Sequence, residues 1–522
     1  MPAYLTQHLS RAIRHFPDRI ATVFRDRRRS YAELGERVAR LADGFRSLGI
    51  EKGHRVGLLA LNSDRYLEYF LAVFRIGAVA NPVNTRWSEK EILFSLEDCA
   101  TTVLLVDDTF REIGERLRAS APHLIERLIY AGEGDAPAGM ISYEALIADS
   151  AATWQTAGDE NGDELGGIFY TGGTTGFPKG VMVTQNSINA SAAGRIMAGS
   201  GPGAVSLHAA PLFHLAGGLC MWSALAVGGT HVFLPSFDPR AAMALIERER
   251  VNDTLIVPTM LQMILDHPEF RSFDLSSLEW VVYGAAPISE TLLDRAVAAL
   301  PNIRFTQGYG MTELSGAVVF LPPAYHTAEG RRAGKLKSAG RAGLLAEAKI
   351  VDSLGNEAPR GQVGEIAVRG GAVMLGYWNR PEETAETLRD GWVYSKDLAF
   401  MDDDGFIYIV DRLKDMIVSG GENVYSAEVE NALMKHPAIS QCAVVGIPSQ
   451  NWGESVHAVV VRKPSANVDS DELIAHCKTL IANYKCPRSV EFRDGLPLSA
   501  AGKILKHELR AEFWKGASRQ VN

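Results

Sequence analysis

The stretch Tyr170-Thr171-Gly172-Gly173-Thr174-Thr175-Gly176-Phe177-Pro178-Lys179-Gly180 contains four glycines, three threonines and one lysine, and it has no acidic residue. It follows an apolar run, residues 166–170, that predicts a buried strand. Glycine allows backbone N–H groups to approach an anion closely, while the threonine hydroxyls add donors and Lys179 adds a cation. The composition therefore predicts a loop that holds phosphate groups.

This loop differs from the Walker type, in which Gly-Lys-Ser/Thr leads directly into a helix. Here Pro178 precedes the lysine, and the apolar residues 181–183 follow it. An ordinary glycine-rich hairpin has a similar composition, because short glycine-rich motifs often match by chance. Both interpretations stay open on these residues alone.

The size and charge of the chain narrow the class of protein. Its 522 residues predict more than one domain. Hydrophobic residues make up 46% and charged residues 22%, which is typical of a soluble globular protein. The formal net charge of −9 disfavours a nucleic-acid-binding protein. The basic run 25–29 is short and includes an aspartate, so a solvated turn explains it better than a nucleic-acid patch.

The cysteine usage favours a reducing compartment. The five cysteines are scattered and have no CxxC spacing, which predicts buried thiols and disfavours a disulfide framework or a zinc site. Residues 1–14 lack the apolar core of a signal peptide, and no apolar run is long enough to span a bilayer. We therefore expect a cytoplasmic protein with no integral membrane segment. The cysteines are Cys99, Cys220, Cys442, Cys477 and Cys486.

Strand-like and helix-like patterns alternate along the first part of the chain. Ser30 and Glu33 form a capping box that opens a helix, and Gly49 is a plausible end for it. A second capping box runs from Ser88 to Glu91. This β/α alternation predicts a largely parallel sheet covered by helices. The strand-like segments are residues 20–24, 56–61, 78–82, 102–106, 230–233, 253–257 and 278–283.

The pattern changes twice toward the C-terminus. Residues 340–410 predict short strands with turns between them, and residues beyond 411 predict helices at 426–435 and 471–481 with strands around them. We expect an α/β fold in which a large N-terminal domain of helix-flanked sheets, residues 1–411, includes a small β-rich subdomain at about 340–411. A small α+β C-terminal domain, residues 412–522, follows.

Polar turns are expected where ligands bind in open α/β sheets, beyond the carboxyl ends of the strands. Besides the glycine–threonine loop, the candidates are Pro211–His214, Tyr283–Pro287 and Gln307–Glu313. The two glycines that flank Tyr309 allow a flat ring to lie against the backbone, and Glu313 offers a hard oxygen ligand for Mg²⁺. Each of these turns is weak evidence by itself.

Taken together and in this order, the motifs resemble those of the acyl-adenylate-forming superfamily, which includes acyl-CoA synthetases, adenylation domains of peptide synthetases and firefly luciferases. The resemblance runs from about residue 5 to residue 512. It implies a C-terminal domain that swings about Lys414. It also implies ATP, Mg²⁺ and CoA as cofactors or co-substrates, and a small carboxylic acid as the partner.

The resemblance implies a role for each matching residue. Lys503, Thr175, Glu313 and His214 are the candidate catalytic residues, and Glu313 is the candidate Mg²⁺ ligand. The residues expected to bind the nucleotide or the pantetheine arm are Thr171, Gly172, Gly173, Thr174, Thr175, Lys179, Gly284, Ala285, Ala286, Gln307, Gly308, Tyr309, Gly310, Met311, Thr312, Asp397, Arg412, Lys414, Gly420, Gly421 and Lys503.

The chain departs from the family pattern at three positions. Gly172 stands where a serine is usual, which removes a hydroxyl donor. Gln185 replaces a histidine of many relatives, and we expect its effect to be indirect. Lys396 precedes Asp397 where a glycine is usual, and a positive φ there would cost on the order of 1 kcal/mol. We favour an exposed, tolerated lysine, with a phosphate contact or weakened nucleotide placement as alternatives.

The reaction that the resemblance implies has two halves. A carboxylate attacks the α-phosphate of ATP, and Lys503 and Mg²⁺ offset the repulsion between the two anions. The C-terminal domain then rotates, so that Gly420 and Gly421 replace Lys503 and the CoA thiolate attacks the acyl-AMP.

The residues expected around the acid are small or apolar. They include no arginine for a second carboxylate and no aspartate for an α-ammonium group, and the glycines leave more room than acetate needs. We expect a medium- or long-chain fatty acid, with an aryl-propenoic acid such as coumarate or ferulate as the nearest alternative. The residues are His214, Gly217, Gly218, Met221, Thr259, Tyr283, Gly284, Gly308, Leu314 and Ala317.

Three functions remain open at this point. The first is an AMP-forming acid–CoA ligase, and the second is a stand-alone adenylating enzyme that loads a carrier protein. The third is a non-catalytic nucleotide- or acyl-binding relative, which the joint presence of Lys179, Glu313, Asp397, Arg412 and Lys503 disfavours. The oligomeric state is also open, with a homodimer among the possibilities.

Overall fold

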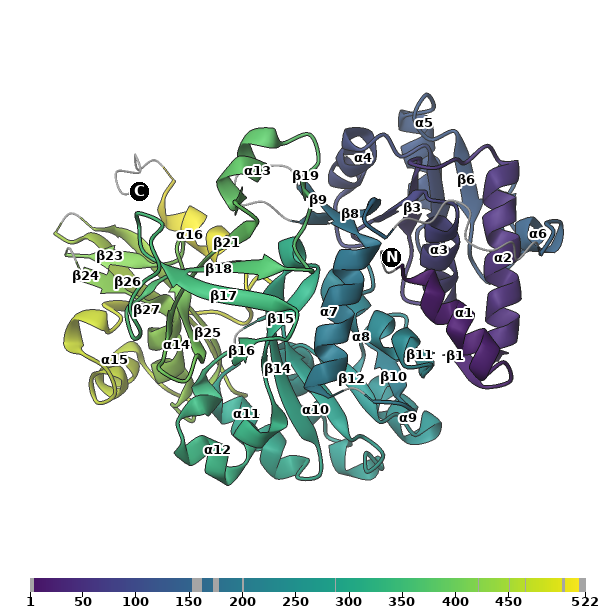
Figure 1. Cartoon of the computed structure of the whole chain (residues 1–522). Helices are drawn as coiled ribbons and strands as arrows, with labels where there is room; N and C mark the ends of the chain where they lie inside the picture. Colours follow the sequence, from purple (N-terminus) through teal and green to yellow (C-terminus); the bar gives the residue numbers. More distant parts are fainter. Residues whose placement is uncertain are drawn as a thin grey trace.

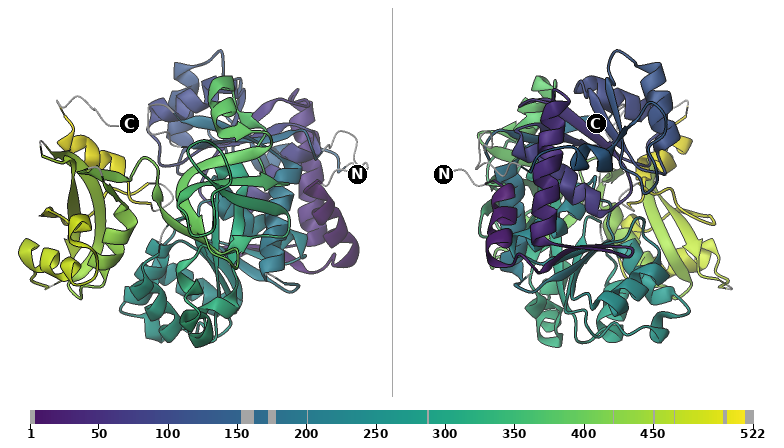
Figure 2. Two further views of the ribbon diagram at one scale, coloured as in Figure 1. Left: turned by 60° about the vertical axis from the view of Figure 1, so that its left-hand side comes forward. Right: turned by 90° about the vertical axis from the view of Figure 1, so that its right-hand side faces the viewer.

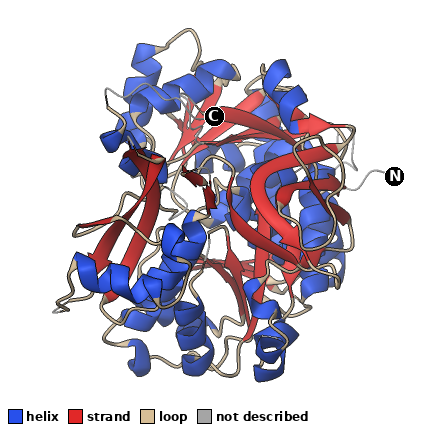
Figure 3. Ribbon diagram, turned by 90° about the vertical axis from the view of Figure 1, so that its left-hand side faces the viewer, coloured by secondary structure: helices blue, strands red, loops and turns tan. Residues whose placement is uncertain are grey.

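The computed structural model describes residues 4–152, 162–171, 178–199, 201–286, 288–420, 422–449, 451–464, 466–499 and 503–515. Residues up to about 410 form a large body of sheets and helices, and the C-terminal residues form a smaller lobe at its side (Figures 1 and 2). Helices lie against the faces of the sheets throughout (Figure 3). The mixed α/β class with a large N-terminal part and a small C-terminal part, as expected from the sequence, is confirmed.

An eight-stranded sheet contains the first parallel strands. Its order is β19-β9-β8-β4-β3-β5-β6-β7, and the pairs β3–β4, β3–β5 and β5–β6 are parallel, as the β/α alternation predicts. The strands are β3 (Arg55–Leu59), β4 (Val79–Pro82), β5 (Val103–Val106), β6 (Arg127–Tyr130), β7 (Ile141–Ser142), β8 (Leu165–Thr171), β9 (Lys179–Thr184) and β19 (Gly376–Tyr377).

A nine-stranded sheet, in the order β16-β15-β14-β13-β12-β10-β11-β1-β2, forms the second layer. Its central strands from β11 to β14 are parallel. The strands are β1 (Ile20–Phe24), β2 (Arg27–Ser30), β10 (Val205–His208), β11 (Thr230–Phe233), β12 (Asp253–Ile256), β13 (Trp280–Gly284), β14 (Arg304–Met311), β15 (Gly316–Leu321) and β16 (Arg341–Ala342).

Helices α7 and α8 lie between these two sheets. Helix α7 contacts β8 and β9 of one sheet and β15 of the other, and α8 packs on β10, β11 and β15. Trp222 of α8 reaches Phe70 of α3 in an edge-to-face contact, with ring centroids 5.3 Å apart, inside the largest apolar core. The helices of the N-terminal part are α1 (Thr6–His15), α2 (Tyr31–Ser47), α3 (Asp64–Arg75), α4 (Glu89–Asp98), α5 (Arg111–Ser120), α6 (Tyr143–Ala148), α7 (Gln185–Ala198), α8 (Leu215–Ala226), α9 (Pro239–Glu249), α10 (Pro258–Asp266), α11 (Glu290–Ala299), α12 (Ala328–Arg332) and α13 (Pro381–Thr387).

Two five-stranded sheets complete the fold. The β-rich part has the order β17-β18-β21-β20 with β22 on β21, and the C-terminal sheet has the order β24-β23-β26-β25 with β27 on β26. Their elements are β17 (Ala346–Val351), β18 (Gly364–Gly370), β20 (Leu388–Arg389), β21 (Trp392–Met401), β22 (Ile407–Arg412), β23 (Ile417–Ser419), β24 (Glu422–Val424), α14 (Ser426–Met434), β25 (Ile439–Ser449), β26 (Gly453–Arg462), α15 (Ser470–Lys478), β27 (Ser489–Phe492) and α16 (Lys506–Phe513).

Several local predictions are confirmed. Both capping boxes form: the Ser30 side chain accepts from Glu33 at the start of α2, and Ser88 accepts from Glu91 at the start of α4. Gly49 follows α2 with a φ of +79°. All five cysteines are free and buried. Among the described helices, none is long and apolar enough to cross a bilayer.

Two predictions about turns need correction. The quoted stretch lies in a hairpin, because β8 and β9 pair antiparallel with Thr171 opposite Lys179. The segment Gln307–Met311 is not a turn but the end of β14, which pairs with β13 and β15. Its two glycines do not end the strand, because a neighbouring strand on each side supplies the hydrogen bonds that hold it extended. Only Thr312–Leu314 leaves the strand, as one turn of 3₁₀ helix.

Candidate functional site

Lys179 lies at the first position of β9, where the hairpin re-enters the sheet. Its ammonium forms an ion pair with Glu383 of α13 and lies 5.5 Å from the centre of the Tyr377 ring. Burial lowers the pKa of Lys179, and the positive charge of Lys396 acts in the same direction. Thr171 ends β8 opposite it. The expected phosphate contacts at Gly172, Gly173, Thr174 and Thr175 fall outside the described residues.

Glu313 is a buried carboxylate in the turn after β14, with 8% of its surface exposed. The Tyr377 hydroxyl donates to its Oε1 atom at 2.7 Å. Burial raises the pKa of Glu313, while that hydrogen bond and the charges of Lys503 and Lys179 oppose the rise. Glu313 and Lys179 thus lie on either side of the same tyrosine, although they are far apart in the sequence.

Asp397 joins three parts of the chain. Tyr309 of β14 donates its hydroxyl proton to Asp397 Oδ2 at 2.7 Å, and Arg412 Nε lies 3.5 Å from Asp397 Oδ1. Asp397 and Arg412 are also direct partners in the β21–β22 pair. The arrangement leaves a half-buried carboxylate beside a largely exposed guanidinium, which suits recognition of two hydroxyl groups.

The backbone is tight where β13 and β14 end. A Cβ atom at Gly284 would overlap the carbonyl oxygen of Gly308, so glycine is required for these strands to pair. Ala285 and Ser315 have φ values of +62° and +53°, which L-residues rarely adopt. Strained backbone of this kind gathers at functional sites. Ala286 is described beside them, whereas Pro287 is not.

Lys503 comes from the C-terminal lobe and reaches the same site. Burial lowers its pKa to about 8; Arg412 acts in the same direction, and Asp397 and Glu313 oppose the shift. The backbone around it is held by a pair of hydrogen bonds, from Ser499 N–H to Lys503 O at 2.6 Å and from Lys503 N–H to the Ser499 hydroxyl at 3.0 Å.

Arg86 links this segment to the large body. Its guanidinium donates to the carbonyl oxygen of Ser499 at 3.2 Å. Arg86 follows the loop after β4 and precedes the capping box of α4. The contact docks the Lys503 segment against the N-terminal part of the chain, and the sequence alone offered no signal for it.

His214 precedes helix α8 and is buried. Burial and the charges of Lys503 and Arg86 lower its pKa to about 3, so the ring is neutral at physiological pH. Its Nε2 atom is buried and has no hydrogen-bond partner within the described parts of the chain. A neutral ring with a free nitrogen close to Lys503 is available to contact a bound substrate.

The segment expected to act as the hinge is held from both sides. Arg510 of α16 donates to the carbonyl oxygen of Lys414 at 3.0 Å, and Leu413 N–H donates to the carbonyl oxygen of Lys396 at 2.9 Å. Gly420 has a φ of +64°, and a Cβ atom there would lie 2.6 Å from the ring of Trp452. Gly421 falls outside the described residues.

The residues expected around the acid divide between two faces of the nine-stranded sheet. Ala317 lies in an apolar cluster with side chains from α8 and from β13, among them Val282 and Trp280. Tyr283 needs correction: because side chains alternate along β13, it points to the opposite face and packs on Phe305. Its hydroxyl is hydrogen-bonded to His326 at 2.9 Å.

Trp280 closes the far end of this apolar cluster. Its side chain is 8% exposed, and a Cβ atom at Gly199 would overlap its ring, so the end of α7 covers it. Leu255, Cys220 and Phe320 pack in the same cluster. Sequence reasoning missed Trp280, although its two-residue offset from Val282 on a strand places both on one face.

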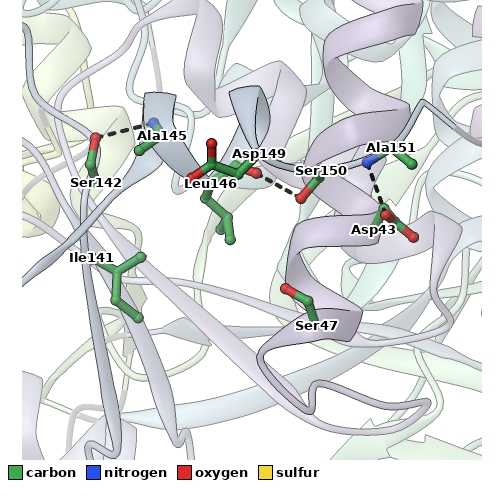
Figure 4. Close-up of a pocket in the computed structure, with 9 residues that line it drawn as sticks. All are labelled: Asp43, Ser47, Ile141, Ser142, Ala145, Leu146, Asp149, Ser150 and Ala151. Atoms are coloured by element: carbon green, nitrogen blue, oxygen red, sulfur yellow. Dashed lines mark hydrogen bonds between the residues drawn. The ribbon is translucent and has the colours of Figure 1, made fainter.

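Two further features do not belong to the site. Gln185 is buried at the first turn of α7, where its side chain accepts from Leu5 N–H at 3.0 Å and ties the N-terminal segment to the helix. A surface pocket of about 530 Å³ lies between α2 and α6 (Figure 4). Its polar groups serve local structure, since Ser142 caps α6 and Asp43 accepts from Ala151 N–H at 3.1 Å.

Comparison with known proteins agrees with this geometry. Residues 9–378 match the family model of AMP-binding enzymes, and residues 428–503 match that of the AMP-binding enzyme C-terminal domain. A feruloyl-CoA synthase of Amycolatopsis sp is 42% identical over 486 residues, which are 93% of this chain and 94% of that protein. The medium/long-chain-fatty-acid–CoA ligase FadD8 of Mycobacterium tuberculosis is 36% identical over 510 residues, covering 95% and 88%.

A solved structure of similar fold gives the same assignment. The anthranilate CoA ligase AuaEII in complex with anthranoyl-AMP superimposes with a TM-score of 0.90 and 26% identity, over 98% of this chain and 97% of that one. The chain therefore belongs to the AMP-binding enzyme family, within the acyl-adenylate-forming superfamily, and it is an AMP-forming acid–CoA ligase.

Proposed function

We propose that this ligase activates an aryl-propenoic acid of the ferulate or coumarate class with ATP, and then transfers the acyl group to CoA. The observation that carries the two-step scheme is Lys503: the C-terminal lobe holds it beside Asp397, Glu313 and His214 of the large body. A lysine on a separate lobe can serve one half-reaction and leave before the other.

In the first half-reaction, a carboxylate oxygen of the acid attacks the α-phosphorus of ATP. The new P–O bond forms as the bond to the bridging oxygen breaks, and pyrophosphate leaves. Lys503 stabilises the negative charge that builds up on the α-phosphate. Lys179 and Thr171 bind the β- and γ-phosphates, together with Gly172, Gly173, Thr174 and Thr175.

The nucleotide is held by its sugar and its base. Asp397 accepts hydrogen bonds from the ribose hydroxyls, and Arg412 contacts the ribose or a phosphate. The adenine lies along residues 284–286 and 307–312, where the glycines leave a flat backbone surface. These roles follow the residues that match the family pattern, and the Tyr309–Asp397 hydrogen bond supports them by fixing the carboxylate.

Mg²⁺ fits the donor set at Glu313. Its Oε1 atom is taken by Tyr377, so one carboxylate oxygen remains for a metal. The described residues hold no cluster of three or more metal-binding side chains. A single carboxylate suits Mg²⁺, which in nucleotide sites is bound by one or two carboxylates with phosphates and water. When bound, Mg²⁺ would neutralise charge on the phosphates.

In the second half-reaction, the C-terminal lobe turns about Lys414, and Gly420 and Gly421 line the path of the pantetheine arm. The CoA thiolate sulfur attacks the acyl carbon of acyl-AMP, the thioester bond forms, and AMP leaves. Gly420 supports this path, because its close approach to Trp452 leaves no room for a side chain. His214 contacts the acyl carboxylate through its free ring nitrogen.

The choice of acid rests on two observations. A feruloyl-CoA synthase is 42% identical to this chain, whereas the fatty-acid ligase FadD8 is 36% identical. In addition, Trp280 and Phe320 close the apolar cluster behind α8 with aromatic rings, which favours a flat, compact acid over a long alkyl chain. A medium- or long-chain fatty acid, which the sequence analysis favoured, is the second candidate.

The test measures AMP and pyrophosphate release with ATP and Mg²⁺ across a panel of acids, with and without CoA. We expect ferulate and p-coumarate to exceed octanoate, palmitate and malonate by at least about tenfold in kcat/KM. Fastest turnover with octanoate or palmitate would replace the aryl acid by a fatty acid. Adenylation that proceeds to thioester only with a carrier protein, and not with CoA, would replace the acceptor.

We also propose a homodimer in the cytoplasm. Both follow from the sequence-based expectation alone. Sedimentation of the purified chain and fractionation of the source cells check them.

A further inference from the structure

Lys396 is held in a conformation that disfavours it. Its φ is +61°, in the left-handed region where a glycine would be relaxed. The strain persists because the backbone is fixed on both sides. Lys396 N–H donates to Glu365 Oε1 at 2.8 Å, and the Lys396 carbonyl accepts from Leu413 N–H at 2.9 Å. The turn would keep its shape with glycine, so the shape does not explain the lysine.

The side chain of Lys396 extends from the Asp397 turn toward Lys179. Lys396 is exposed, and its charge lies close enough to Lys179 to lower the pKa of that lysine, second only to burial. The chain connects the two regions directly. Tyr377 of β19 pairs with β9 next to Lys179, and α13 then leads to β20, which pairs with β21.

Two lysines side by side in an empty site repel each other. That repulsion adds to the backbone strain, so Lys396 carries two costs that glycine at this position would remove. Both costs are offset when a polyanion lies between the two ammonium groups, because each then gains a charge-assisted hydrogen bond. Asp397 is the next residue, so such an anion would lie next to the group that we assign to the ribose.

We propose that Lys396 and Lys179 form a two-lysine clamp on the triphosphate of ATP, in which Lys396 is a phosphate-contacting residue of this chain. The inference rests on the proposed function, since it takes the nucleotide to bind at Asp397. In this clamp Lys396 approaches the phosphates from the ribose side, and Lys179 approaches them from the hairpin side. AMP, which lacks the β- and γ-phosphates, would engage the clamp weakly.

The test compares nucleotide binding by the full-length wild-type chain and its variants, measured by titration calorimetry with ATP and with AMP. Lys396→Gln keeps the strained backbone and removes the charge, and we expect it to weaken ATP binding roughly 10-fold and AMP binding less than about twofold. Lys396→Arg should retain most of the ATP affinity. The ATP affinity of Lys396→Gln should also fall less steeply with added salt.

Lys396→Gly and a matched control separate strain from charge. Arg25 is also an exposed cation with a positive φ, +56°, and it lies in the β1–β2 turn away from the site. Arg25→Gly and Lys396→Gly should both raise the melting temperature, but only Lys396→Gly should weaken ATP binding.

Equal ATP affinity in the wild type and Lys396→Gln would overturn the clamp and leave the proposed function intact. Equal loss of ATP and AMP binding would also overturn it, because the lysine would then act on the nucleoside. A wild-type chain that forms the clamp but turns over no acid would instead refute the proposed function.

Discussion

Lys503 brings a positive charge into a crowded, partly buried position, and this sets the pH range of the first half-reaction. Its pKa is lowered to about 8 by burial and by Arg412. The ammonium form is needed to offset charge on the α-phosphate, so activity is present below this pKa and lost as the pH rises through it. We expect kcat/KM for ATP in pyrophosphate exchange to fall about tenfold per pH unit above about pH 8.

The same residue should divide the two half-reactions. Lys503→Ala should slow adenylation by roughly 10²–10³-fold, the loss typical for a group that stabilises charge in a transition state. Conversion of preformed acyl-AMP to the thioester should change little, because Lys503 leaves before that step. Lys478→Ala, an exposed lysine of α15, serves as the control. A pH profile that stays flat to pH 10, or an adenylation rate unchanged in Lys503→Ala, would remove Lys503 from the mechanism.

At the scale of elements, the loop before α4 holds the C-terminal lobe in the position seen here. Arg86 makes this contact through a single hydrogen bond to Ser499 O, which is worth about 1 kcal/mol. Arg86→Ala should therefore slow pyrophosphate exchange by about fivefold and spare thioester formation from acyl-AMP. Arg116→Ala, which removes an exposed ion pair with Glu89 of α4, is the matched control. Equal slowing of both half-reactions would show that Arg86 does not act through docking.

Elements that depend on local chemistry are the ones that sequence reasoning predicted well. The capping boxes at Ser30 and Ser88 lie at the starts of α2 and α4 because a cap needs only neighbouring residues. The end of β14 was predicted as a turn because of its glycines, whereas pairing with β13 and β15 decides its conformation. Tertiary pairing of this kind overrides local preference.

The site divides in the same way. The family pattern identified Glu313 and Asp397, and the structure brings each to a tyrosine hydroxyl. Tyr377 and Arg86 were not predicted, because their roles depend on contacts between segments far apart in the sequence. The positive φ of Lys396 was foreseen as a condition, since a lysine replaces the usual glycine, and the backbone has that conformation.

At the scale of the whole molecule, buried histidines make stability depend on pH. Burial lowers the pKa of His214 and His231 to about 3, and that of His326 to about 4, against about 6.5 in an unfolded chain. The unfolded state therefore binds more protons in this range. The histidine contribution is present above pH 6.5 and is lost as the pH falls toward 4, by up to about 1.4 kcal/mol per pH unit for each ring.

Buried carboxylates such as Glu313 and Asp411 have raised pKa values and act in the opposite direction, so one histidine must be isolated by difference. His326 suits this purpose because its ring meets the Tyr283 hydroxyl, a contact that the amide of His326→Gln can replace. Urea unfolding at pH 7.5, 6.5, 5.5 and 5.0 should show wild-type stability falling more steeply than that of His326→Gln below pH 6.5. By pH 5.0 the difference should reach about 2 kcal/mol. Parallel curves for the two proteins would mean that His326 is protonated in the folded state, and its burial would then not govern its charge.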